Sequence, residues 1–158
     1  MSKEMLLGEI SSMTEFFDRS TRVLTEADST YTPQDGLFTV AQVVAHVAQT
    51  IDWFVEGAFA AEGFSMDFET MDKQVRAVTS LDHARQWLAN SIAKANAAVE
   101  EKPEAEWYVP LPPGPIMGGL PRAAVFGALT DHTAHHRGAL TVYSRLLGKV
   151  PPMPYMEM

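Results

Sequence analysis

The chain has 158 residues, of which 46% are hydrophobic and 20% are charged, a composition typical of a globular protein with one sizeable core. Twelve Lys and Arg residues against twenty Asp and Glu residues give a formal net charge of −8, and the basic residues are scattered. Because nucleic-acid binding depends on a positive surface, this balance speaks against nucleic acid as a partner; the lack of a long apolar run speaks against a membrane span, and the lack of cysteine excludes disulfides and thiolate ligands.

Two helices are predicted in the first part of the chain. Residues 5–27 carry apolar side chains at intervals of three or four positions, which is the period of an amphipathic helix. Residues 28–36 are rich in turn-forming residues and end this helix. The second helix is expected over residues 39–61, because Thr39 and Gln42 form a capping-box pattern at its start.

The third helix is predicted after a segment without a clear pattern. Residues 64–78 fit either a loop or a short turn. The helix then begins at Thr79 or Ser80, either of which could cap it, and runs to about Glu101, because Pro103 stops it.

The fourth helix follows a long connection. Residues 102–121 carry six prolines and three glycines, and Pro121 fits the first position of a helix that runs to about Leu147 and ends at Gly148. Four helices with long connections predict an all-α fold, a four-helix bundle with crossovers. We find no linker that divides the chain, and we therefore expect a single domain over residues 1–158. The start of the chain does not resemble a secretory signal, so we expect a cytoplasmic location.

Three histidines are the most informative residues. His132 and His136 stand four positions apart, in line with Leu129 and Leu140 on the apolar stripe of the fourth helix, so one face presents both imidazoles. His46 lies at the edge of the apolar stripe of the second helix. Three imidazoles from two helices predict an open site for one divalent metal ion, Zn²⁺, Ni²⁺, Fe²⁺ or Mn²⁺. The alternative is that they are core histidines with local hydrogen-bond partners.

Two other metal motifs are excluded. No glutamate follows His132 directly, so the His-Glu-x-x-His motif of metalloproteases is absent. The Glu-x-x-His pairs of di-iron bundles are absent as well. A mononuclear site is therefore the better interpretation.

Polar neighbours of the histidines have two possible roles. Asp52 and Glu56 follow His46 on the second helix. Either could accept a hydrogen bond from a ligand N–H or act as a general base; the alternative is that both lie on a solvated helix face. His135 points away from the stripe and fits either a supporting role or a surface position, paired with Asp131.

Aromatic and basic side chains offer a possible substrate pocket. Trp53, Trp107 and Tyr108 fit pocket walls, but a core or dimer contact is an equal alternative. Arg137 fits either an anionic substrate or a carboxylate at a subunit interface.

The motifs resemble a known family. Residues 38–46, Phe-Thr-Val-Ala-Gln-Val-Val-Ala-His, the run His-Thr-Ala-His-His-Arg-Gly at 132–138 and the closing Leu-Leu-Gly with Pro151 are similar to the DinB-like superfamily of metal-binding four-helix bundles. The resemblance covers nearly the whole chain and implies that His46, His132 and His136 are metal ligands. Ala139 stands where the family often has glutamine.

The resemblance also implies a function. It indicates homodimers and a metal site that opens to a pocket, and relatives include S-transferases that use low-molecular-weight thiols. We therefore expect thiol transfer to a small electrophilic substrate. Metal-dependent hydrolysis is the alternative enzyme activity, and metal or small-ligand binding without turnover, or a structural metal, are the alternatives outside catalysis.

Overall fold

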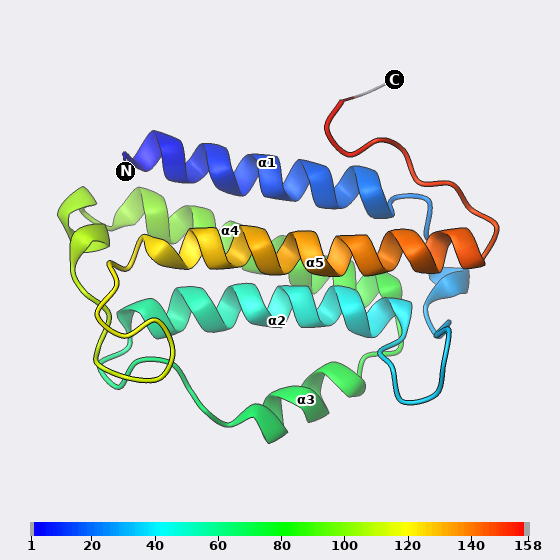
Figure 1. Ribbon diagram of the computed structural model, residues 1–158, viewed down its shortest axis with the longest axis horizontal. Helices are drawn as coiled ribbons and strands as arrows, with labels where there is room; N and C mark the ends of the chain where they lie inside the picture. Colours follow the sequence, from blue (N-terminus) through cyan, green and yellow to red (C-terminus); the bar gives the residue numbers. More distant parts are fainter. Residues whose placement is uncertain (1, 157–158) are drawn as a thin grey trace.

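The computed structural model describes residues 2–156, and this part of the chain is helical without a β-strand (Figure 1). Its two short 3-10 helices are η1 (Glu26–Asp28) and η2 (Glu104–Tyr108). Its five α-helices are α1 (Lys3–Thr21), α2 (Val40–Phe59), α3 (Phe68–Arg76), α4 (Leu81–Glu101) and α5 (Ala124–Leu146). The predicted all-α class is confirmed, and the fifth helix is a difference from the prediction.

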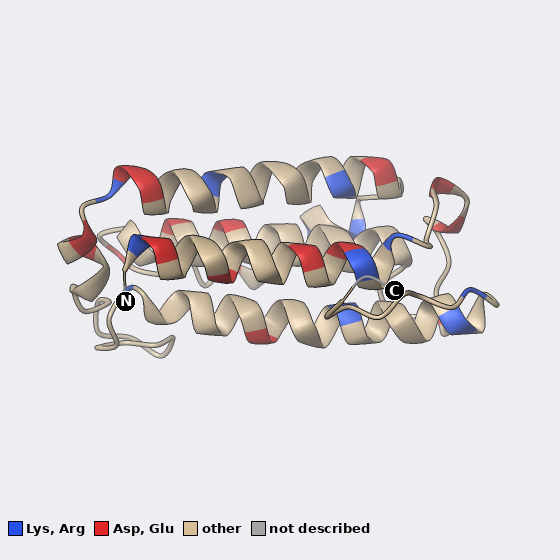
Figure 2. Ribbon diagram, turned by 90° about the horizontal axis from the view of Figure 1, so that it is seen from above, with Lys and Arg blue, Asp and Glu red and all other residues tan. Residues whose placement is uncertain are grey.

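Four long helices lie side by side, as the two perpendicular views show (Figures 1 and 2). Helices α1 and α5 run in one direction, and α2 and α4 run in the opposite direction. Because the neighbours α2 and α4 are parallel, the chain must return along the whole length of α2 before α4 begins. The connection that contains α3 makes this return, which explains why α3 lies outside the four long helices.

The core lies between the long helices. Side chains from α1, α2, α4 and α5 fill it, and each such leucine or isoleucine stabilises the fold by about 1.5–3 kcal/mol relative to an exposed position. The largest fully buried side chains are Leu6, Ile10, Leu24, Val40, Val44, Ile51, Leu81, Trp107, Leu111, Phe126, Leu129 and Leu140. No helix within residues 2–156 combines the length and apolar character needed to cross a bilayer.

The first helix is shorter than the sequence predicted. It starts at the cap Ser2 and ends at Thr21, not at residue 27. The backbone N–H of Thr25 donates to Asp28 Oδ2 over 2.7 Å, and Lys149 forms an ion pair with the same carboxylate. These contacts favour the separate turn η1 over a continued helix.

Residues 64–78 contain a helix where the sequence was open to a loop or turn. Asp67 caps α3, because its Oδ1 accepts from the N–H of Thr70 over 3.1 Å. An ion pair one turn apart, Arg76 Nε to Asp72 Oδ2 at 2.8 Å, supports the exposed face. Val75 is fully buried and anchors the helix on the core.

The last helix begins at Ala124 and not at Pro121. The chain before it forms a short antiparallel pairing: the N–H of Leu111 donates to Leu120 over 2.8 Å, and the N–H of Arg122 donates to Val109 over 3.0 Å. Pro121 takes part in this pairing opposite Pro110. Helix α5 therefore starts only beyond the residues that take part in this pairing.

Candidate metal centre

Local sequence signals place His46 in the second turn of α2. The side chain of Thr39 accepts from the N–H of Gln42 over 3.3 Å, and Gln42 Oε1 accepts from the N–H of Thr39 over 3.0 Å, as the capping box predicted. The Nε2 of Gln42 also donates to the carbonyl oxygen of Arg76 over 2.9 Å. The start of α2 is thus tied to the end of α3, close to His46.

The structure brings the three predicted metal ligands together. His132 and His136 lie one turn apart on α5, and α2 presents His46 to them. Nε2 of His132 lies 3.2 Å from Nε2 of His46 and 3.1 Å from Nε2 of His136. The three ligand atoms all lie within 4.8 Å of one another. Tetrahedral bonds of about 2.0–2.1 Å to a metal would separate two nitrogens by about 3.3 Å, so the residues fit a divalent ion.

Hydrogen bonding alone does not satisfy this arrangement. A neutral imidazole nitrogen carries either a proton or a lone pair, so Nε2 of His132 cannot donate to one neighbour and accept from the other. A metal ion would accept a lone pair from all three rings at once. The Nδ1 atom of His132 is buried and has no hydrogen-bond partner among residues 2–156, which leaves that ring held by its packing.

Burial keeps the three rings neutral near pH 7. It lowers the pKa of His132 to about 4 and that of His136 to about 3, and the neighbouring imidazoles add to both shifts. Burial also lowers the pKa of His46, against the opposing charge of Asp72. The lone pairs are therefore available to a metal at neutral pH, since only the neutral imidazole is a ligand.

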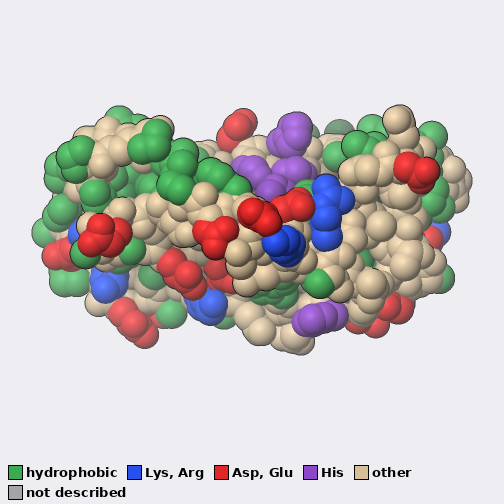
Figure 3. Space-filling view, turned by 90° about the horizontal axis from the view of Figure 1, so that it is seen from below, with side chains coloured by type: hydrophobic (Ala, Val, Ile, Leu, Met, Phe, Trp, Pro, Cys, Tyr) green, Lys and Arg blue, Asp and Glu red, His purple; other side chains and the backbone are tan. Residues whose placement is uncertain are grey.

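An apolar cavity of about 390 Å³ adjoins the histidines. Helix α2 forms one wall and α3 the opposite one, so the helix that the sequence left open supplies part of the site. Figure 3 shows histidine side chains gathered in the middle of the face seen from below, where ring atoms reach the surface. The cavity is lined by Phe38, His46, Gln49, Thr50, Trp53, Phe54, Phe68, Met71, Asp72 and His132.

Several lining residues were not singled out from the sequence. Phe68, Met71 and Val75 share the three- and four-residue spacing of a helix face, and Asp67 is a good cap. These signals were present in the sequence. The wall position of Phe68 and Met71 depends on how the return connection crosses α2, which no local pattern encodes.

Two acidic residues face away from the histidines. Asp52 accepts from the indole N–H of Trp87 over 2.8 Å and from Nζ of Lys94 over 3.2 Å. Glu56 is exposed and lies 3.7 Å from the same ammonium group. Both carboxylates therefore connect α2 to α4, and the structure does not bring them to the three rings.

The two tryptophan candidates lie in different places. Trp53 lines the cavity and donates through Nε1 to the carbonyl oxygen of Ser65 over 2.8 Å. Trp107 is fully buried, away from this cavity, against Phe59 and Phe126.

Two residues of α5 beside His132 and His136 point away from the histidine cluster. His135 is exposed and its ring touches that of His136 edge-on, with the centroids 4.8 Å apart. Arg137 lies against the rings of Phe16 and Tyr155 and donates to the hydroxyl of Tyr155 over 3.2 Å. It therefore faces the C-terminal segment and not the metal cavity.

The fold and the histidine cluster define a helical protein with three histidines placed so that they could hold one metal ion. The chain belongs to the DinB family, whose model matches residues 1–158. None of the curated proteins matches it.

Two solved structures share the fold. The colibactin self-resistance protein ClbS, in complex with double-stranded DNA, is 15% identical with a TM-score of 0.67, and the match covers 91% of this chain and 96% of ClbS. A conserved protein from Enterococcus faecalis is 14% identical with a TM-score of 0.67, and the match covers 94% of this chain and 99% of that protein. At these identities the likeness shows the fold alone.

The expectation that nucleic acid is not a partner is wrong, because its basis does not hold for this fold. ClbS has this fold and is in complex with double-stranded DNA. The expectation rested on the formal net charge of −8 and on the scatter of basic residues along the sequence, neither of which reports where individual cations lie on the folded surface. Arg137 and Arg145, for example, line the same depression beside the C-terminal segment despite the acidic total.

Proposed function

We propose that the protein is a metal-dependent enzyme that transfers a low-molecular-weight thiol to a small electrophile. The observation that supports this most directly is the convergence of three Nε2 atoms beside an apolar cavity. Three protein ligands leave at least one coordination position for an exogenous ligand, which is the arrangement of catalytic and not of structural zinc sites. A bound divalent ion would lower the pKa of a thiol or a water molecule in that position.

The chain's own residues would bind and orient the second substrate. Trp53, Phe54 and Phe68 offer an apolar surface that excludes water from the reacting atoms. Gln49, Thr50 and Asp72 add polar groups to a lining that, apart from the histidines, is otherwise apolar. Asp52 on α2 is held by Trp87 and Lys94, and Asp72, the one carboxylate among the residues that line the cavity, forms an ion pair with Arg76. A thiol, which ionises easily on a metal, therefore suits the site better than a reaction that needs a strong general base.

Metal content tests the ligand assignment. We expect one divalent ion per wild-type chain and none in the His132→Ala/His136→Ala double variant, measured by elemental analysis after purification. His83→Ala removes an exposed histidine on α4 and is the matched control. Equal metal content in the wild type and the double variant would exclude the site.

Product analysis separates the reactions. Metal-loaded protein is incubated with an electrophilic aromatic halide, with and without a panel of thiols. Consumption that requires both the thiol and the three histidines supports transfer. Consumption without thiol supports the alternative, metal-dependent hydrolysis. Stable metal binding with no consumption under either condition supports the third candidate, a protein that binds metal or a small ligand without turnover.

Duplex DNA is a second candidate partner, because ClbS, which shares the fold, is in complex with it. Arg145 is exposed on α5 and could contact a phosphate. With a net charge of −8, we expect any affinity to be weak and to fall steeply with salt. Fluorescence anisotropy of a labelled duplex at low salt, with Arg145→Glu as the variant, tests it. Assembly of two copies and a cytoplasmic location stay predictions.

A further inference from the structure

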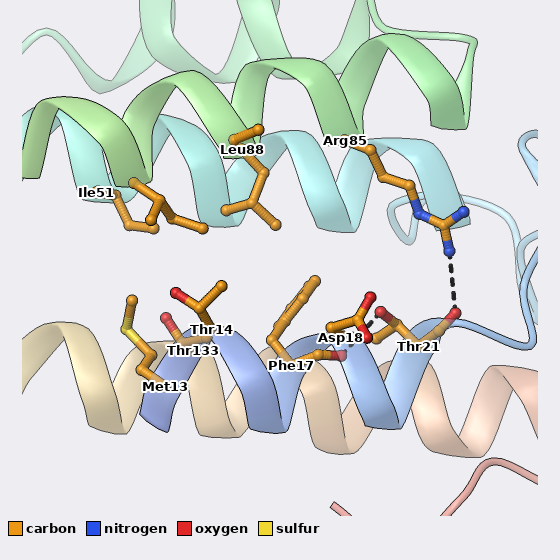
Figure 4. A pocket seen from close by; sticks show the side chains of 11 residues that line it. Met13, Thr14, Phe17, Asp18, Thr21, Ile51, Arg85, Leu88 and Thr133 are labelled. Atoms are coloured by element: carbon orange, nitrogen blue, oxygen red, sulfur yellow. Dashed lines mark hydrogen bonds between the residues drawn. The ribbon is translucent and has the colours of Figure 1, made fainter. Parts of the chain in front are cut away.

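A second cavity, of about 200 Å³, lies between α1 and α4 on the other side of the core (Figure 4). It shares no lining residue with the cavity at the histidines. Its floor is nine-tenths or more buried and consists of Met13, Phe17, Thr21, Ile51, Leu88 and Thr133. Its mouth, where side chains reach solvent, consists of Thr14, Asp18, Arg85, Ala89 and Ile92.

The two helices that flank this cavity are joined at both ends. At one end, Arg85 donates through one nitrogen to the carbonyl oxygens of Thr21 and Leu24, over 3.1 and 3.0 Å. At the other end, Nζ of Lys3 donates to the carbonyl oxygen of Glu100 over 2.6 Å. These contacts fix α1 against α4 on either side of the cavity.

One hydroxyl in the cavity has no partner. Thr14 and Thr21 donate to the carbonyl oxygens of Ile10 and Phe17, over 2.7 and 2.9 Å, as helical threonines commonly do. Thr133 is only 2% exposed, and its Oγ1 atom is buried. Within residues 2–156 this hydroxyl makes no hydrogen bond. A buried unpaired hydroxyl costs about 1–3 kcal/mol, and a bound molecule that pairs with it would recover that cost.

Size and charge limit what can bind. An apolar cavity of about 150 Å³ is sufficient for benzene, so this one accommodates a single ring with one substituent. The floor carries no ionisable side chain, and the nearest cation, Arg85, already donates to two backbone carbonyls. A charged ligand would lose its hydration without a partner, which excludes it from the floor.

We propose that this cavity is a second binding site, for a compact uncharged molecule of about the size of phenol with one hydrogen-bonding group. The ring lies among Met13, Phe17 and Leu88, and the polar group pairs with Oγ1 of Thr133. Because Thr133 directly follows the metal ligand His132, an occupant of this site contacts the same turn of α5 that holds the metal.

Phenol and toluene are the probes that test the site, with dissociation constants measured by ligand-observed NMR on the full chain. We expect both to bind the wild type. Thr133→Val keeps the shape and removes the hydroxyl, so phenol binding should weaken about 3- to 10-fold while toluene binding does not weaken. Ala89→Phe at the mouth should weaken both, whereas Ala93→Phe, at an exposed position of α4 outside the cavity, should weaken neither.

Two results would overturn the proposal. One is equal phenol affinity of the wild type and Thr133→Val, and the other is the absence of saturable binding of either probe. Metal content of each variant is measured in parallel. Because this site uses none of the metal ligands, a protein without metal that still binds phenol through Thr133 would refute the proposed enzyme function and leave this proposal intact.

Discussion

Gln49 donates from Nε2 to the carbonyl oxygen of Met71 over 2.8 Å, and this hydrogen bond holds α3 against α2 across the cavity beside His46 and His132. Gln42 makes the equivalent contact to the end of α3, at Arg76. Two glutamines of one helix face thus fix the opposite wall of the cavity. The position of α3, and with it the width of the cavity, depends on side-chain hydrogen bonds as well as on packing.

Replacement of Gln49 by leucine should therefore change substrate binding more than metal binding. Loss of one hydrogen bond to the partly buried carbonyl of Met71 costs about 1 kcal/mol and loosens the wall there. The side chain of Gln49 also hydrogen-bonds to His46, so metal content is measured beside the kinetics. We expect KM for the electrophile to rise about 3- to 10-fold while the three histidines still retain the metal. Steady-state kinetics and elemental analysis measure the two. Gln86→Leu, on the exposed face of α4, is the control, and an equal rise of KM in both variants would contradict this role.

Stability of the metal-free protein should fall as the pH is lowered. In the folded protein the pKa of His132 is lowered to about 4 and that of His136 to about 3, whereas an unperturbed imidazole titrates at 6.5. Between these values the unfolded chain binds more protons than the folded protein, so the free energy of unfolding decreases as the pH falls below about 6.5. The slope cannot exceed about 1.4 kcal/mol per pH unit for each ring, because each ring binds at most one proton, and partial exposure lowers the total loss.

Urea unfolding of chelator-treated protein, at about pH 7.5 and about pH 5, measures this dependence. His132→Ala/His136→Ala lacks two of the three rings and should show a shallower loss over the same range. If the double variant loses as much stability as the wild type, the histidines are not the groups responsible.

Removal of the metal should lower the melting temperature of the wild type. An ion present at about 100 times its dissociation constant stabilises the folded state by about 2.7 kcal/mol, which for a chain of this size corresponds to about 5–10 °C. Differential scanning fluorimetry with and without a chelator measures the shift. The double histidine variant should melt at one temperature under both conditions; a chelator effect of the same size there would show that the ion is bound elsewhere.

Substitutions of Trp107 and Trp53 should affect different properties, stability for Trp107 and substrate binding for Trp53. Trp107 is fully buried against Phe59 and Phe126, so Trp107→Ala should lower the free energy of unfolding by about 3–5 kcal/mol. Trp53 is partly exposed and lines the metal cavity, so Trp53→Ala should weaken substrate binding at a smaller cost in stability. Denaturant unfolding and KM distinguish the two roles. Weaker substrate binding in a folded Trp107→Phe variant would assign this residue to the cavity instead.

The sequence predicted the elements whose signals are local. Thr39 and Gln42 cap α2, Ser80 caps α4, and α4 ends at Glu101 before Pro103, as expected. The spacing of His132 and His136 on one helix face also had a local cause, and their meeting with His46 followed from the apolar stripes on which all three lie.

Where the helix ends differ from the prediction, the causes are contacts between residues far apart in the sequence. Helix α5 begins late because hydrogen bonds join Val109 to Arg122 and Leu111 to Leu120, and α1 ends early because Asp28 pairs with Lys149 from the far end of the chain. Helical periodicity within a window carries no information on partners so distant. The orientation of Asp52 also depends on distant residues, since its carboxylate accepts hydrogen bonds from Trp87 and Lys94 of α4.

His46 and His132 are separated by 86 positions, so their meeting joins α2 to α5 across more than half of the chain. A metal ion that bonds to both would act as a reversible cross-link, closing a long loop that contains α3, α4 and the proline-rich connection. The entropy of such a loop grows with the logarithm of its length, so the link opposes unfolding of the whole intervening segment. Metal release during unfolding would then report the opening of this long loop and not the fraying of any single helix.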